Sequence, residues 1–197
     1  MSVILIDTTS YLKLSKGLHP LLGKPVGQPP RPCQIVSEVD SEFEKKATLA
    51  QTFYWVSEPE FVQNRAPNLL SALAVGLKEV KEWREQVSAW AQMNRREYKA
   101  LGLTPPSPAD CLLIAYGIAA SEKWKTRTAV VSDDGGVRHT VAQLDYSDAL
   151  SGWQVIKMFV DAQLVDIAQV KQIYGHLNHL HELPRDWRNN SLAAFGF

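Results

Sequence analysis

The sequence has few cysteines and no excess of charge. Only 2 of its 197 residues are cysteine, and the formal net charge at pH 7 is +0. Cys33 and Cys111 stand far apart in apolar surroundings, without metal-ligand or redox spacing, so we expect two reduced core thiols and no disulfide. The charge balance argues against a surface that is basic throughout, although it leaves room for a local basic strip.

Long hydrophobic runs are also missing. No stretch approaches the ~20 apolar residues that are needed to span a bilayer. The apolar run at the start is too short for the core of a signal peptide, and Asp7 follows it at once. We therefore expect a cytoplasmic protein that does not enter a membrane.

Several familiar catalytic motifs are absent as well. The chain has no P-loop, no glycine-rich dinucleotide turn and no Gly-x-Ser-x-Gly elbow. The histidines in residues 176–181 do not form the His-Glu-x-x-His pattern of zinc proteases, and no cysteine lies near them. We interpret that segment as a solvated helix face.

Two apolar runs, each ending in acid, are the main positive feature. Residues 2–6 precede Asp7, and the β-branched run 128–132 precedes Asp133 and Asp134. Runs of this length and composition are typical of buried parallel strands. Because ligands bind beyond the carboxyl ends of strands in open α/β sheets, the two runs predict one shared acidic pocket.

The rest of the chain is predicted to be mostly helical. Residues 48–101 are expected to be helical except for a break near 59–67, and the apolar stripe from Leu70 to Trp90 predicts one long core-facing helix. A further helix over 109–123 starts after a Ser107 cap, a short strand is expected near 144–146, and two helices follow residue 148. A loosely ordered tail is expected beyond residue 184.

Four carboxylates occupy similar places in separate segments: Asp7, Glu42, Asp110 and Asp134. Taken singly, each is explained by helix capping or by a solvated face. Held together, they would raise one another's pKa unless a cation compensated their charge. Hard oxygen ligands without histidine or cysteine point to Mg²⁺ or Mn²⁺, which can activate water and stabilise a leaving oxygen in phosphodiester hydrolysis.

Four segments in this order resemble the signature segments of the PIN domain. They are Ile-Leu-Ile-Asp-Thr-Thr (4–9), Val-Asp-Ser-Glu-Phe (39–43), Ser-Pro-Ala-Asp-Cys-Leu-Leu-Ile-Ala (107–115) and Val-Val-Ser-Asp-Asp (130–134). The resemblance implies a three-layer α/β/α fold with a central parallel sheet and a Mg²⁺- or Mn²⁺-dependent ribonuclease site. Many bacterial members are toxins that an antitoxin protein holds inactive, and they are often dimeric.

The resemblance also assigns roles to residues. Asp7, Glu42 and Asp110 match the first three family acids. In the fourth segment the family shows Thr or Ser, any residue and then Asp, which selects Asp134 as the fourth metal-binding and catalytic acid. The supporting positions are Thr8, Ser132 and Asp133, and Arg138 either contacts substrate phosphate or pairs with an acid.

The implied organisation is a PIN-like nuclease domain over residues 1–147 and a helical extension over 148–197 packed on the same domain. The helical insert at about 60–101 and the extension both depart from the compact toxins. We expect an endoribonuclease acting on RNA, with an antitoxin and a second copy of the chain as candidate partners.

Two other functions are compatible with the sequence. One is a PIN fold with a weak or inactive site that acts as a binding or scaffold module, which the neutral net charge favours mildly. The other is an Asp-based phosphotransfer enzyme such as a haloacid-dehalogenase-like phosphatase. Thr9 occupies the place where that family has a second aspartate, which argues against this alternative.

Overall fold

A computed structural model describes residues 2–38 and 51–197. Glu42, one of the four predicted acids, lies outside the described residues. The described residues form a six-stranded sheet. Its strands are β1 (Ile4–Ile6), β2 (Pro25–Val26), β3 (Arg31–Val36), β4 (Leu69–Leu70), β5 (Thr128–Val131) and β6 (Ser147–Leu150).

The sheet is parallel except for one short strand. β4, β3, β1, β5 and β6 lie side by side in that order and run in the same direction, while β2 pairs with the start of β3 in the antiparallel sense. In the register of the central pair, Ile6 lies opposite Val131. Both central strands are completely buried, as their uninterrupted apolar sequences predict.

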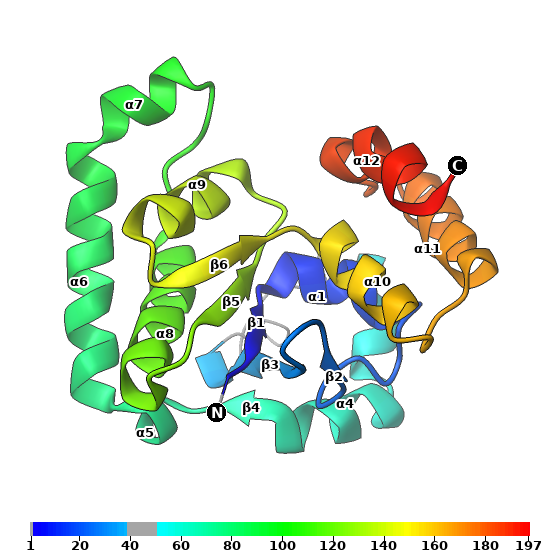
Figure 1. Ribbon diagram of the computed structural model, residues 1–197, viewed down its shortest axis with the longest axis horizontal. Helices are drawn as coiled ribbons and strands as arrows, with labels where there is room; N and C mark the ends of the chain where they lie inside the picture. Colours follow the sequence, from blue (N-terminus) through cyan, green and yellow to red (C-terminus); the bar gives the residue numbers. More distant parts are fainter. Residues whose placement is uncertain (1, 39–50) are drawn as a thin grey trace.

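Helices cover both faces of the sheet, which confirms the predicted three-layer α/β/α architecture. Figure 1 shows α8 and α9 on one side of the sheet and α1 and α10 on the other, with α6 outside α8. The α-helices are α1 (Thr8–Ser15), α4 (Pro59–Arg65), α5 (Ala72–Val75), α6 (Leu77–Met93), α7 (Arg95–Ala100), α8 (Pro108–Trp124), α9 (Gly135–Leu144), α10 (Gly152–Asp161), α11 (Ile167–His179) and α12 (Arg185–Phe195). Two 3₁₀ turns, η1 (Tyr54–Ser57) and η2 (Ala66–Asn68), flank α4.

Some elements lie where the sequence predicts them. Ser107 caps α8 with Pro108 in the first turn, and Cys33 and Cys111 are buried free thiols. Burial raises the pKa of the Cys33 thiol to about 12. Within residues 2–38 and 51–197, no helix is long and apolar enough to cross a membrane.

Other expectations were wrong. The predicted helical break near 59–67 contains α4, because Pro59 starts a helix at its first position, where its missing N–H costs nothing. Leu70 belongs to β4 and not to a helix. The last strand was expected near 144–146 but starts at Ser147. Asp145 adopts the left-handed backbone conformation (φ 57°) that ends α9 just before it. The apolar stripe is only partly a core face, since Leu77 is 64% exposed.

The segment after β6 is an ordered part of the structure. α10, α11 and α12 contribute Val155, Val170 and Trp187 to the same hydrophobic core as β1. The indole of Trp187 is fully buried, so the expectation of a loosely ordered tail was wrong. Gly152 permits this packing, because a Cβ there would lie 2.2 Å from the Trp187 ring.

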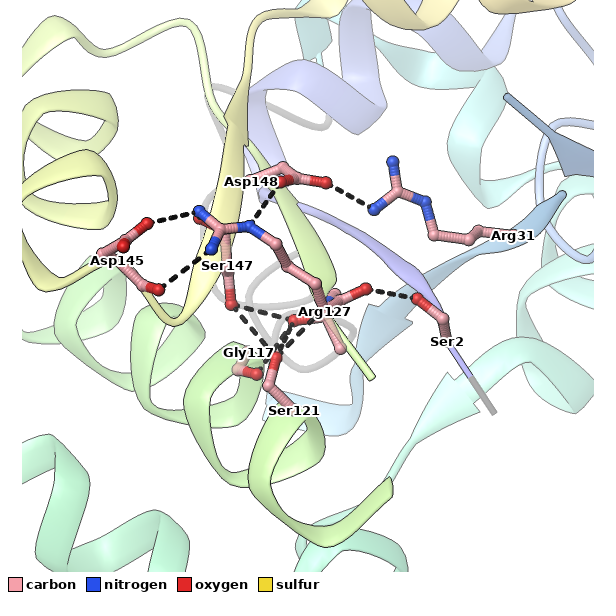
Figure 2. A network of polar contacts seen from close by, with 9 residues as sticks. Ser2, Arg31, Gly117, Ser121, Arg127, Asp145, Ser147 and Asp148 are labelled. Atoms are coloured by element: carbon pink, nitrogen blue, oxygen red, sulfur yellow. Dashed lines mark hydrogen bonds and ion pairs between the residues drawn. The ribbon is translucent and has the colours of Figure 1, made fainter. Parts of the chain in front are cut away.

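A charged and hydroxyl network ties the strands together at their amino ends (Figure 2). Arg127 donates hydrogen bonds to Asp145 (2.7 Å) and Asp148 (2.6 Å), and Asp148 also accepts one from Arg31 (2.7 Å). Beside them, the Thr128 hydroxyl donates to the Gly117 carbonyl and lies 2.8 Å from two serine hydroxyls, Ser121 and Ser147. This network lies at the opposite end of the strands from the acids predicted to be functional.

Candidate functional site

The candidate site begins where β1 and β5 end side by side. The Asp7 amide donates to the Val131 carbonyl at 3.0 Å, and the Ser132 amide donates to the Leu150 carbonyl at 3.0 Å. The chain leaves β1 toward β3 on one side and leaves β5 toward β6 on the other. Such a reversal of strand order opens a crevice outside the carboxyl ends of the strands, which is where open α/β sheets bind ligands.

A cavity of about 560 Å³ lies at this point. Four carboxylates contribute to its lining, which are Asp7, Asp110, Asp133 and Asp134. The structure therefore brings the three described members of the predicted acid set to one cavity and adds Asp133 to them. Two cationic residues, Lys13 and Arg185, line the same space.

Asp7 is a buried helix cap with a shifted pKa. Its side chain accepts a hydrogen bond from the Ser10 amide at 2.5 Å and thereby caps α1. Burial raises the pKa of Asp7 to about 6, and the charge of Asp133 also raises it, whereas hydrogen bonds from Ser132 and Ser10 oppose the change. A carboxyl group with this pKa exchanges its proton near neutral pH and responds strongly to a nearby cation.

Asp110 and Asp134 act as helix caps while they line the cavity. Asp110 accepts from the Ser107 amide at 2.8 Å in a reciprocal capping box at the start of α8. Asp134 accepts from the Gly136 amide at 2.6 Å and the Val137 amide at 3.3 Å at the start of α9. Each carboxylate is thus fixed in place by the amino end of a helix, where the helix dipole favours a negative charge.

Asp133 links the sheet to the C-terminal helices. Its Oδ1 accepts from the Trp187 indole at 2.7 Å and the Gly152 amide at 3.0 Å. Its Oδ2 lies 3.7 Å from Lys13 Nζ and, in the described part of the chain, is buried without a hydrogen-bond partner. The resemblance gave Asp133 a supporting place, and the structure shows it as the most enclosed acid of the β5 turn.

The remaining predicted residues lie around this turn. Thr8 is buried at the start of α1 and lines the cavity. Ser132 is fully buried, and its hydroxyl accepts from the Asp134 amide at 3.2 Å. Arg138 donates to the Ser132 carbonyl at 2.9 Å and lies 3.5 Å from Asp186. For Arg138 the contacts favour the ion-pair alternative over the phosphate contact.

Sequence reasoning missed three contributors to the site. Lys13 follows Thr9 by four residues on α1, and both line the cavity, so the helical spacing was an available signal. Arg185 and Trp187 belong to a polar segment without apolar periodicity, and no sequence signal pointed to the cavity.

The donor chemistry fits a hard divalent cation. Across the described ranges, no three histidine, cysteine, aspartate or glutamate side chains are grouped so that they could hold a metal ion. Mg²⁺, however, commonly keeps several waters and binds one or two protein carboxylates. The charge of Asp133 acts on Asp7, and one buried oxygen of Asp133 has no hydrogen-bond partner among residues 2–38 and 51–197, so these two carboxylates fit an ion of this kind.

Comparison with known proteins adds one weak structural similarity. Models of protein families give no match, and curated protein sequences give none. Among solved structures, the chain is similar to one described as the crystal structure of FitAcB from Neisseria gonorrhoeae, with 14% identity and a TM-score of 0.39. The similarity covers 77% of this chain and 99% of that chain.

Proposed function

We propose that this protein is a metal-dependent endoribonuclease that acts at the cavity beyond β1 and β5. The observation that carries the proposal is the buried carboxyl group of Asp7, whose pKa is raised to about 6 in a cavity also lined by Asp110, Asp133 and Asp134. Such a concentration of acid at the strand switch point has little value for packing, but it suits the binding of a cation and a phosphodiester.

The residues divide into ligands and positioning groups. Asp7 and Asp133 would hold the Mg²⁺ or Mn²⁺ ion, and Asp110 and Asp134, fixed by their helix ends, line the same cavity. When bound, the ion supplies an activated water and stabilises the leaving oxygen. A bound cation also keeps Asp7 ionised at neutral pH, which burial alone opposes. Lys13 and Arg185 attract the phosphate backbone that a purely acidic cavity would repel.

Glu42 completes the proposed acid set. It lies outside the described residues, so its place in the site rests on the resemblance of the 39–43 segment to the PIN domain. On the same basis we propose that the protein is the toxin of a toxin–antitoxin pair, with a protein antitoxin and a second copy of the chain as partners.

A second candidate is a PIN-like binding or scaffold module with little catalytic activity. Two observations favour it. The capping bonds of Asp110 and Asp134 explain these residues without any ligand, and the described residues contain no three-ligand metal group.

Metal binding separates the two candidates. Calorimetry with Mn²⁺ should show binding to wild type and none to the Asp7→Asn/Asp110→Asn double variant. Glu85→Gln, an exposed change on α6, should bind as wild type does. Cleavage of a fluorescent single-stranded RNA should follow the same pattern and stop in EDTA. If wild type binds no Mn²⁺ and cleaves no RNA, the nuclease proposal is wrong and the scaffold function is favoured.

A further inference from the structure

A second cavity adjoins the acidic one. Its volume is about 310 Å³, and Lys13 lines both. Lys16 at the end of α1 and Gln169, Gln172 and His176 on α11 form much of its wall. The acidic cavity is thus continued by a space whose charged lining groups are cationic.

The second cavity is built by a close approach of two helices. Gly17 follows α1, and a Cβ at this position would lie 2.1 Å from the Ile173 side chain on α11. Gln169, Gln172 and His176 recur at intervals of three and four residues, so they share one helix face, which is turned toward the end of α1. Two amides, an imidazole and two ammonium groups therefore line the same cavity.

Aromatic rings continue this surface outward. Lys16 Nζ lies 4.7 Å from the centroid of the buried Trp55 ring and 5.5 Å from that of Tyr54. The Trp55 indole donates to the Ser15 hydroxyl at 3.2 Å, which fixes its orientation. Tyr54 packs edge-on against Trp55 and is 59% exposed. An exposed tyrosine ring therefore lies against a fixed indole and beside an ammonium group.

His176 continues the wall of the second cavity beside Trp55. Its ring centroid lies 5.3 Å from that of Trp55, and its Nε2 is buried with no hydrogen-bond partner among residues 2–38 and 51–197. Burial lowers the pKa of His176, and the charges of Lys16 and His179 lower it further. The imidazole therefore lines the second cavity as a ring packed against Trp55, beside the ammonium group of Lys16.

We propose that Lys13, Lys16, Tyr54 and His176, here called the cationic strip, bind single-stranded RNA on one side of the cleaved phosphate. The exposed ammonium group of Lys16 contacts a backbone phosphate, the enclosed Lys13 adds positive charge beside it, and Tyr54 stacks on a base. The combination of a positive track with an exposed aromatic platform is the usual basis of single-strand binding. The inference rests on the proposed function, because it describes how the substrate of that site is held.

Binding without cleavage tests the cationic strip directly. Fluorescence anisotropy of a labelled oligouridylate is measured in EDTA at several salt concentrations. Lys16→Gln should weaken binding and reduce the salt slope of log K by about 0.7, the value for one phosphate contact on a single strand. Tyr54→Ala should weaken binding about fivefold or more, the lower range for a stacked base.

Two matched variants serve as controls. Tyr54→Phe keeps the ring and should retain wild-type affinity. Lys81→Gln removes an exposed lysine from α6, which Figure 1 shows on the opposite side of the molecule from α11. This variant should keep both the affinity and the salt slope. Because Lys16 is exposed, its substitution tests the inference even if Tyr54→Ala fails to fold.

The outcomes separate this inference from the proposed function. RNA binding that is unchanged in Lys16→Gln and in Tyr54→Ala overturns the cationic strip, even if wild type cleaves RNA. Binding that these variants weaken, in a protein that neither binds Mn²⁺ nor cleaves, supports the strip and overturns the nuclease proposal. A polyglutamate peptide that occupies the strip more tightly than RNA would overturn the RNA assignment in favour of an acidic protein partner.

Discussion

Replacing Asp7 by asparagine should stabilise the metal-free protein while it removes the proposed nuclease activity. Asparagine is a good helix N-cap and retains the acceptor oxygen for the Ser10 amide. The charge, however, disappears from a buried position beside Asp133. The rise in the pKa of Asp7 from 3.8 to about 6 corresponds to about 3 kcal/mol, since each pKa unit represents about 1.36 kcal/mol.

The sign of this energy follows from proton binding. Below pH 3.8 the carboxyl group is protonated in both the folded and the unfolded chain, so it contributes nothing. Between pH 3.8 and about 6 the unfolded chain loses the proton first, and the free energy of unfolding of wild type falls as pH rises. Above about pH 6 the full cost of the buried charge is present, and the variant should be the more stable protein.

The expected net gain near neutral pH is about 2 kcal/mol. A neutral cap loses about 0.3–1 kcal/mol of attraction to the positive end of α1, which is subtracted from the 3 kcal/mol. For a chain of this size, 1 kcal/mol shifts Tm by about 2–4 °C, so Tm should rise by about 4–8 °C. Thermal and urea unfolding in EDTA between pH 4 and pH 8 measure the difference.

Asp134→Asn is the matched control. Asp134 also caps a helix and lines the same cavity, but it is exposed. Its substitution should change the free energy of unfolding by only a few tenths of a kcal/mol, as is usual at exposed positions. Added Mn²⁺ should stabilise wild type and not Asp7→Asn. A variant at Asp7 that is less stable than wild type at pH 7, by an amount that persists at pH 4, would refute the reasoning.

Three further substitutions test other parts of the structure. Trp187→Ala should cost about 3–5 kcal/mol by opening a cavity beside Asp133, and unchanged urea unfolding would contradict the burial of the indole. Burial raises the pKa of Asp148, but hydrogen bonds from Arg31 and a second arginine bring it below its ordinary value. Asp148→Asn should therefore cost about 1–3 kcal/mol at pH 7, discounted for partial exposure, and the difference should shrink below about pH 4, where wild type also loses the charge. Tyr98→Phe removes a 2.5 Å hydrogen bond to a buried threonine hydroxyl on α9 and should lower Tm by about 2–4 °C, as calorimetry can show.

The central strands could be predicted because their chemistry is local. The apolar runs that end at Asp7 and Asp133 have no polar face, and only a strand buried on both sides accommodates such a pattern. Their acids then meet because parallel neighbours end at the same edge of a sheet. By contrast, β4 contains only Leu69 and Leu70 in register with β3, which is too short for any periodicity to appear in the sequence.

The walls of the site could not be predicted, because they depend on contacts between distant segments. Trp187 lies 54 residues from Asp133, and nothing around it indicates that its indole donates to that carboxylate. The same contact explains why Asp133 is more enclosed than Asp134, although the two acids are adjacent in sequence. The resemblance of residues 130–134 to the PIN domain selects Asp134 as the functional acid. Burial and hydrogen bonding instead single out Asp133.

The position of α12 has a consequence for synthesis on the ribosome. The segment that carries Arg185 and Trp187 is translated after every other described element that lines the acidic cavity. A nascent chain that ends before it has an open cavity and an Asp133 carboxylate without its indole donor. The lining of the acidic cavity is therefore complete only after the segment that carries Arg185 and Trp187 has left the ribosome and packed against the rest of the chain.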